Sequence, residues 1–262
     1  DDAFRRDFKI NALYLDIHSM EIIDYTGGYK DLENKKLSCI GDSKVRFRED
    51  PVRIIRAIRF ISAMDLDCEE SLKNDIYGLA NLLEEVPTAR RYEEVLKLFF
   101  TGSASKTFDN LLEYKVLRYL LPSTSRYFEK ENSDKKIIHF IRLALKNSDS
   151  RVVKDLPLTP AFLFSVLLWP SLVKRIGEIQ SSKIKIPLLR KAADKAIREQ
   201  NTHCFIPNRV ESMIIEIWEF QIRLLNTDSP KITSLITHKR FRASYDFLIL
   251  REQSGVNLNG CG

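Results

Sequence analysis

The pattern of hydrophobic and polar positions changes character at about residue 48. Before that point, residues 8–40 show no clean helical period, residues 21–25 predict a short strand, and Gly27-Gly28 predicts a turn. After it, apolar residues recur at helical spacing almost to the end of the chain. We therefore expect a predominantly α-helical protein that opens with a short α/β segment. The expected helices cover residues 51–64, 69–85, 90–101, 105–114, 136–146, 160–169, 171–179, 186–200, 207–225 and 231–251, the last with a break near Phe241. Loops are expected where polar and turn residues cluster, at 122–134, 147–157, 181–183 and 226–230.

The helix that follows Asp50-Pro51 has two different faces. Asp50 is a good N-cap and Pro51 suits the first helical position. At about 100° per residue, Arg53, Arg56 and Arg59 fall near 0°, 300° and 240°, while isoleucines and an alanine occupy roughly 40° to 200°. One face is therefore expected in the core. The arginine face fits two interpretations, a solvated or salt-bridged surface and a clamp for phosphate groups near a helix N-terminus.

Two other segments carry candidate chemistry. Residues 5–13 place two arginines, one aspartate and one asparagine ahead of an apolar stretch. In residues 87–97, Arg90 and Glu94 stand four positions apart and share a helix face. That pair is either an ordinary ion pair or a set of fixed donors and acceptors for the edge of a base.

Composition and charge narrow the class of protein. The chain has 262 residues, of which 44% are hydrophobic and 10% aromatic, so it is expected to fold, as about two domains. Its longest apolar run, residues 161–169, stops at Pro170 and is too short to span a membrane. Residues 1–100 carry 16 Lys and Arg against 20 Asp and Glu, whereas residues 101–262 carry 26 against 16. The basic part suits a polyanion such as RNA, although many helical domains are basic for solubility alone.

Cysteines and histidines argue against disulfide and metal chemistry. The four cysteines are scattered, no Cys-x-x-Cys pair occurs, and the four histidines lie far apart. This pattern predicts neither a disulfide scaffold nor a zinc site and fits a reducing compartment, here the cytoplasm. The Gly102–Thr107 segment lacks the glycine that precedes lysine in a phosphate-binding loop, and Asp65-Leu66-Asp67 is expected in a solvated turn.

Taken together, these segments resemble the class II nucleotidyltransferases, the family of bacterial tRNA nucleotidyltransferases (CCA-adding enzymes) and bacterial poly(A) polymerases. Residues 5–13 look like the family's Arg-Arg-Asp-Phe-Thr-Ile-Asn-Ala motif, with Lys9 where threonine is usual. Residues 49–60 look like its Glu-Asp-Pro-x-Arg-x-x-Arg-Ala-x-Arg-Phe motif without departure, and residues 24–32 and 40–42 lie between them in the expected order. The Ala-Arg-x-x-Glu-Glu-x-x-Lys segment at 89–97 and several body segments are closer to the poly(A) polymerases.

The resemblance implies an activity and a division of the chain. Family members join a nucleoside monophosphate from ATP or CTP to an RNA 3′ hydroxyl and release pyrophosphate, using Mg²⁺ held mostly by an Asp-x-Asp strand. We expect that strand upstream of this chain, so the fragment alone is expected to bind RNA without extending it. Residues 1–47 would be the end of the catalytic head, 48–101 a nucleotide-binding neck, and 102–262 an RNA-binding body truncated at its C-terminus. Polyadenylation with ATP is the leading expectation; the alternatives are CCA addition and a non-catalytic RNA-binding relative.

The resemblance also assigns roles to single residues. Asp7 is the expected catalytic carboxylate, and Asn11 would hold the geometry of the site or contact the sugar. Asp50 would cap its helix and orient an arginine. Arg90 with Glu94 would read the base. The phosphate-binding arginines would be Arg5, Arg6, Arg53 and Arg56. Lys239, Arg240 and Arg242 are candidates for RNA backbone contact, with a solvated helix end as the alternative. This interpretation requires that the residues near Arg5 and those near Arg56 meet at one cavity.

Overall fold

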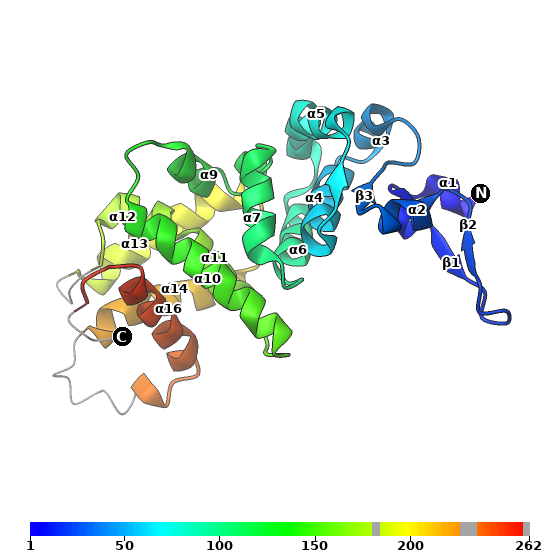
Figure 1. Ribbon diagram of the computed structural model, residues 1–262. Coiled ribbons are helices and arrows are strands. Elements are labelled where there is room, and N and C mark those ends of the chain that lie inside the picture. The colour runs from blue at the N-terminus through cyan, green and yellow to red at the C-terminus, as the bar shows by residue number, and fades with distance from the viewer. Residues whose placement is uncertain (180–183, 226–234, 259–262) are drawn as a thin grey trace. The chain divides into compact units, whose positions relative to one another are not determined.

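The computed structural model describes residues 1–179, 184–225 and 235–258 (Figure 1). The chain divides into two compact units, residues 1–119 and 120–262. Residues 102–119, which the sequence assigns to the body, belong to the first unit together with the whole expected neck. The division into head, neck and body stays a prediction.

The first unit opens with small elements around a hairpin. They are α1 (Asp2–Arg5), the 3₁₀ turn η1 (Lys9–Asn11), β1 (Leu13–Leu15), β2 (Ile22–Asp24) and α2 (Gly28–Glu33). β1 and β2 pair antiparallel, with Leu13 opposite Asp24, which confirms the strand expected at 21–25. The Asp24 carboxylate accepts hydrogen bonds from the backbone N–H groups of residues 26–29, at 2.9–3.1 Å, and so builds the turn that leads into α2. Gly28 lies so close to η1 that a Cβ there would sit 2.1 Å from the Lys9 carbonyl oxygen.

Helices and one short pair of strands make up the rest of the first unit. The elements are β3 (Lys36–Leu37), α3 (Ser43–Glu49), α4 (Val52–Met64), β4 (Asp67–Cys68), α5 (Glu70–Leu79), the 3₁₀ turn η2 (Ala80–Glu85), α6 (Thr88–Phe99), α7 (Ala104–Glu113) and α8 (Leu117–Leu120), which ends just past the boundary between the units. β3 and β4 pair in parallel. α4 packs against α6 and α7. Its isoleucines are almost completely buried, so the predicted apolar face is the core face. Pro51 is the N-cap of α4 rather than its first residue.

The second unit is a helical bundle. It contains α9 (Pro122–Glu129), α10 (Lys135–Val153), α11 (Pro160–Leu167), α12 (Trp169–Ile176), α13 (Ile186–Asn201), α14 (Asn208–Leu224) and α16 (Phe241–Gln253). α11 packs against α14, and α16 contacts both α10 and α14 (Figure 1). Phe140, Trp169 and Phe247 form an aromatic cluster in its core, with ring centroids 4.7–6.3 Å apart. No helix in the described ranges is long and apolar enough to cross a membrane.

Several predicted boundaries are wrong. The expected loop at 122–134 contains α9, because Pro122 stands in the first turn of a helix, where it is tolerated. α10 continues to Val153, into the expected loop at 147–157; Ser148 is buried on the packed face of this helix, and its hydroxyl is satisfied by the Ala144 carbonyl. The expected helix 69–85 changes to a 3₁₀ turn after Leu79. α3 was not predicted; its N-cap is Asp42, whose side chain accepts from the Val45 N–H. Two expected loops, 181–183 and 226–230, and residues 231–234 of the last expected helix lie outside the described residues; α16 begins at the predicted break.

Candidate nucleotide-binding site

The first unit contains a cavity of about 420 Å³ that collects most of the predicted site residues. We call it the arginine cavity. Six cationic and four acidic side chains line it, together with one amide and one valine. They are Arg5, Arg6, Asp7, Asn11, Asp50, Val52, Arg53, Arg56, Arg90, Glu93, Glu94 and Lys97. The N-terminal segment and α4 therefore meet at one cavity, as the interpretation of the sequence requires.

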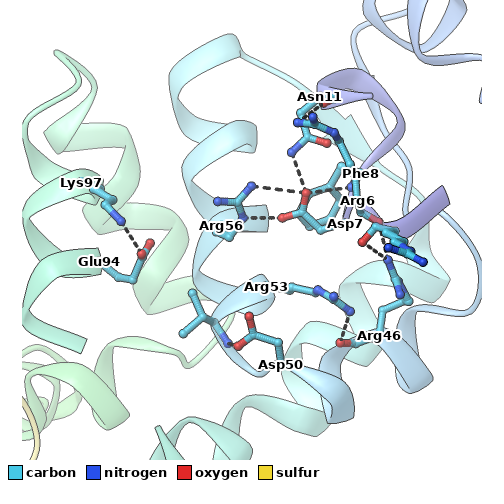
Figure 2. Close-up of polar contacts among 12 residues, drawn as sticks. Arg6, Asp7, Phe8, Asn11, Arg46, Asp50, Arg53, Arg56, Glu94 and Lys97 are labelled. Atoms are coloured by element: carbon cyan, nitrogen blue, oxygen red, sulfur yellow. Dashed lines mark hydrogen bonds and ion pairs between the residues drawn. The ribbon is translucent and has the colours of Figure 1, made fainter. Parts of the chain in front are cut away.

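Asp7 and Arg56 join the two segments directly. The Asp7 side chain is only 6% exposed, and its carboxylate is held from both sides (Figure 2). Its Oδ1 accepts from the Asn11 amide at 2.6 Å and from the Phe8 backbone N–H at 3.0 Å, while its Oδ2 accepts from the Arg56 Nε. Burial raises the pKa of Asp7, but the hydrogen bonds from Arg56 and Asn11 outweigh it and hold the pKa below its ordinary value. Asp7 is therefore an anion that fixes the position of Arg56.

Arg53 is fixed by groups from the preceding helix. Its Nη1 donates to the Glu49 carboxylate at 2.7 Å and to the Arg46 carbonyl at 2.9 Å. Arg46 in turn donates to the carbonyl of Arg5 at 2.7 Å and to that of Arg6 (Figure 2). Sequence reasoning missed this role of Arg46, and the signal for it was weak, since it lies on the unpredicted helix α3. The result is a second connection between the N-terminal segment and the start of α4.

Arg90 and Glu94 have different partners from each other. Arg90 donates to one oxygen of the Asp50 carboxylate at 2.8 Å, so Asp50 holds this arginine. The other Asp50 oxygen accepts from the Val52 N–H at 3.2 Å. Glu94, 6% exposed, accepts from the Lys97 ammonium at 2.7 Å (Figure 2). The second Glu94 oxygen, Oε2, is buried and accepts no hydrogen bond from the described residues. Lys97 and Glu93 also line the cavity, although the predicted site residues include neither. The signal for Lys97 was its position as the last residue of the 89–97 segment that carried the family resemblance.

Arg5 and Arg6 differ in how they are held. Arg6 pairs with Asp2 at 3.0 Å, and its guanidinium lies 5.5 Å from the centre of the Tyr14 ring. The Arg5 side chain is exposed and has no ion pair within the described part of the chain. Arg5 is thus the cation in this cavity most open to an added anion.

The described residues do not make a complete magnesium site. Among them, no group of three or more His, Cys, Asp or Glu side chains could hold a metal ion. Both Asp7 oxygens already accept from protein donors, so a metal ion at this carboxylate would compete with Arg56 and Asn11. The catalytic role of Asp7 stays a prediction.

The three candidate RNA-binding cations lie in the second unit, around a separate crevice. Lys239, Arg240 and Arg242 all line it. The Arg240 Nε pairs with Glu216 at 3.0 Å, whereas the Arg242 side chain is 84% exposed.

Comparison with known proteins finds similar proteins over most of the chain. Three family descriptions match the chain: "Poly A polymerase head domain" over residues 1–38, "Probable RNA and SrmB- binding site of polymerase A" over 65–128, and "Polymerase A arginine-rich C-terminus" over 182–261. Poly(A) polymerase I of Escherichia coli O157:H7 is 36% identical over 97% of this chain and 55% of its own length. A CCA-adding enzyme of Streptococcus thermophilus is 37% identical over 46% of this chain and 30% of its own length. The solved structure of a tRNA-processing enzyme in an apo form shares the fold, with a TM-score of 0.61 at 19% identity, over 98% of this chain and 68% of that structure.

The matches define the class of protein as a nucleotidyltransferase family. The chain belongs to the family of the bacterial poly(A) polymerases and CCA-adding enzymes. Its similarity to the poly(A) polymerase I relatives extends over almost its whole length, and it spans about half of theirs.

Proposed function

We propose that this chain provides the nucleotide-binding and RNA-binding parts of a template-independent polynucleotide adenylyltransferase. In that reaction the α-phosphorus of ATP forms a bond to the RNA 3′ oxygen, the bond to pyrophosphate breaks, and the 3′ hydroxyl loses its proton. The observation that supports this most is the convergence of Arg5, Arg53 and Arg56 on one cavity. The similarity to poly(A) polymerase I over 97% of the chain supports the choice of activity.

The phosphate groups of the nucleotide would bind at the start of α4. Arg53 and Arg56 project from the first turns of that helix, where the helix dipole also favours anions. A guanidinium group offers two parallel donors that match phosphate oxygens. Arg5 would add a contact without first giving up a carboxylate partner.

The base would be read at Glu94. A buried carboxylate oxygen with no donor is costly, and an amino group of a bound base would satisfy it. Adenine and cytosine carry such an exocyclic amine, whereas guanine and uracil present a carbonyl oxygen at that edge. A carbonyl facing Glu94 would leave two acceptors in contact, so the site is expected to reject GTP and UTP. Arg90, which Asp50 holds, would donate to a ring nitrogen of the same base.

This chemistry also supports a second candidate function. Because adenine and cytosine share the exocyclic amine, Glu94 is compatible with a CCA-adding enzyme, and the match to the Streptococcus thermophilus protein points the same way. Use of CTP distinguishes the two. A non-catalytic RNA-binding relative would bind RNA and incorporate neither nucleotide.

The direct test measures nucleotide binding to the 262-residue chain by isothermal titration. Arg56→Ala should raise the Kd for ATP by about 10-fold to 150-fold, equivalent to the 1.5–3 kcal/mol of a lost charge-assisted hydrogen bond. Arg59→Ala is the matched control, because Arg59 lies one turn further along α4 and is not among the residues that line the cavity. If both variants bind ATP equally well, the arginine cavity is not the nucleotide site. In a protein that also carries the expected Asp-x-Asp strand, incubation of a short RNA with each of the four nucleoside triphosphates and Mg²⁺ then separates the three functions on a gel.

A further inference from the structure

The second unit has a crevice that is lined partly by apolar side chains. It has a volume of about 190 Å³ and is lined by residues of α10, α11, α14 and α16 and by the segments next to them. Phe162, Ile217 and Ala243 supply carbon surface, and the Phe162 ring is fixed by an edge contact with Phe247, at 6.2 Å between centroids. The crevice is smaller than the roughly 300–1,000 Å³ of pockets that hold drug-sized ligands. Its size suits one planar ring system.

The crevice has more cationic than acidic lining residues. Arg151, Lys239, Arg240 and Arg242 all line it, and Asp246 is the acidic residue among the lining side chains. The second unit as a whole has 23 Lys and Arg against 14 Asp and Glu. Arg242 is held only loosely, with its Nε 3.9 Å from the Asp246 carboxylate. Apolar surface beside cationic side chains is complementary to a base attached to a phosphate backbone.

Two polar groups inside the crevice favour particular bases. Asn147, on α10, lines the crevice, and its amide has no hydrogen-bond partner among the residues that the structure describes. An asparagine amide pairs with adenine through one donor and one acceptor. The Asp246 carboxylate can accept only from an amino group, so it disfavours the carbonyl edges of guanine and uracil.

A stacked aromatic pair lies beside the crevice on α16. The rings of Phe241 and Tyr245 are 5.6 Å apart between centroids and inclined by only 10°, and Tyr245 is 36% exposed. Arg242 stands between this pair and the crevice along the helix surface. Exposed aromatic faces stack on unpaired bases, so the pair extends the surface available to a single strand.

We propose that this crevice holds one adenine base of single-stranded RNA, with Asn147 as the residue that reads it and Arg242 as a backbone contact. The inference rests on the proposed function, in which the product carries a run of adenines, and it assigns that function a second place where adenine is recognised. Sequence-specific RNA recognition targets unpaired bases that can be turned out of a strand, which is what a crevice of one-base size requires.

The test measures the binding of fluorescent single-stranded oligo(A), oligo(C) and oligo(U) to the 262-residue chain by anisotropy. The wild-type chain should bind oligo(A) most tightly. Asn147→Leu should weaken oligo(A) binding by about 5-fold to 150-fold, the value of one bidentate base contact, and leave oligo(U) nearly unchanged. Leucine suits a helix surface position, so the fold should survive, and circular dichroism checks this.

Arg242→Ala should act differently from Asn147→Leu. It should weaken all three oligonucleotides alike and reduce the slope of log K against log salt by about 0.7, the value for one phosphate contact on a single strand. Arg198→Ala, an exposed cation on α13 that is not among the crevice-lining residues, is the matched control and should change neither quantity.

The outcomes separate this inference from the proposed function. Equal affinity of the wild-type chain for the three oligonucleotides, or an unchanged preference in Asn147→Leu, overturns the inference. ATP binding at the arginine cavity of the first unit is measured independently, and its loss in Arg56→Ala supports the proposed function even if the crevice reads no base. If the wild-type chain binds none of the oligonucleotides, both the inference and the RNA-binding part of the proposed function are wrong.

Discussion

The ion pair between Asp7 and Arg56 should contribute measurably to the stability of the first unit. The Asp7 side chain is 6% exposed and the Arg56 side chain 31% exposed, so removing either partner leaves the other poorly solvated. Breaking a fully buried pair costs about 3–5 kcal/mol, but water can partly resolvate the Arg56 guanidinium. We therefore expect Asp7→Asn to lower the free energy of unfolding of this unit by about 2 kcal/mol, the scale of one hydrogen bond to a charged group. Arg56→Met should cost about 3 kcal/mol, because it strands the more deeply buried charge.

The assay has to report on the first unit alone. Both tryptophans, Trp169 and Trp218, lie in the second unit, so tryptophan fluorescence does not follow the unfolding of the first. Hydrogen exchange of the slowest amides of α4, measured by mass spectrometry, gives the opening free energy where it is needed. Tryptophan fluorescence in urea then serves as the internal control and should be the same in all variants.

Two results would refute this reasoning. In a double-mutant cycle, Asp7→Asn and Arg56→Met should be non-additive by about 1–2 kcal/mol, since each removes the same interaction; strict additivity means that the pair contributes nothing. The pH dependence gives the second check. Because the pKa of Asp7 is lowered on folding, its contribution is complete above the ordinary aspartate value of about 3.9 and is lost as the pH falls through the lowered value. As the pH falls through this range, the protection of the α4 amides should weaken more in the wild-type chain than in Asp7→Asn. An equal loss of protection in the two proteins would contradict the assignment.

Three further predictions concern stability. Gly28→Ala should destabilise the first unit by about 1–3 kcal/mol through the clash with the Lys9 carbonyl, whereas Gly78→Ala, in open space on α5, should stabilise it by about 0.5–1 kcal/mol; hydrogen exchange of α4 measures both. Arg251→Met should destabilise the second unit by about 3–5 kcal/mol, since the fully buried guanidinium neutralises Glu178 at 2.7 Å. Urea unfolding followed by tryptophan fluorescence measures this loss, and adding Glu178→Gln should restore most of it. Burial raises the pKa of Asp24, but the hydrogen bonds from backbone N–H groups outweigh the effect of burial and lower the pKa. The exchange protection of the amides of residues 26–29 should therefore fall as the pH drops through the lowered pKa, and Asp24→Asn should abolish this pH-dependent fall.

The sequence predicts best where local signals agree. α4 was predicted almost to the residue, because an N-cap, a proline and a helical period all point to the same start and the same buried face. The helices at 122–129 and 147–153 were missed for the opposite reason. Their polar residues resemble a loop locally, and they become helical through capping and packing in the second unit.

The geometry of the site depends on contacts that no local pattern contains. Asp7 and Arg56 are 49 residues apart, and only the motifs that carry the family resemblance suggested that they belong to one site. Helical spacing predicts an ion pair between Arg90 and Glu94. In the structure Arg90 instead pairs with Asp50, which lies in a different part of the chain, and Glu94 pairs with Lys97. Arg46, which holds two carbonyls of the N-terminal segment, was not predicted because its helix was not.

Most guanidinium and ammonium groups around the arginine cavity are already bound to carboxylates. Their rotamers are therefore set during folding, and a ligand does not have to order them again. The same arrangement predicts weak binding of small anions, because an anion with a single negative charge gains one contact with a cation only by breaking that cation's ion pair with a carboxylate. A ligand gains when several linked negative groups arrive together and each takes over one cation. Such a pocket discriminates by the number and spacing of charges, and its released carboxylates would repel whatever anion does not fill it.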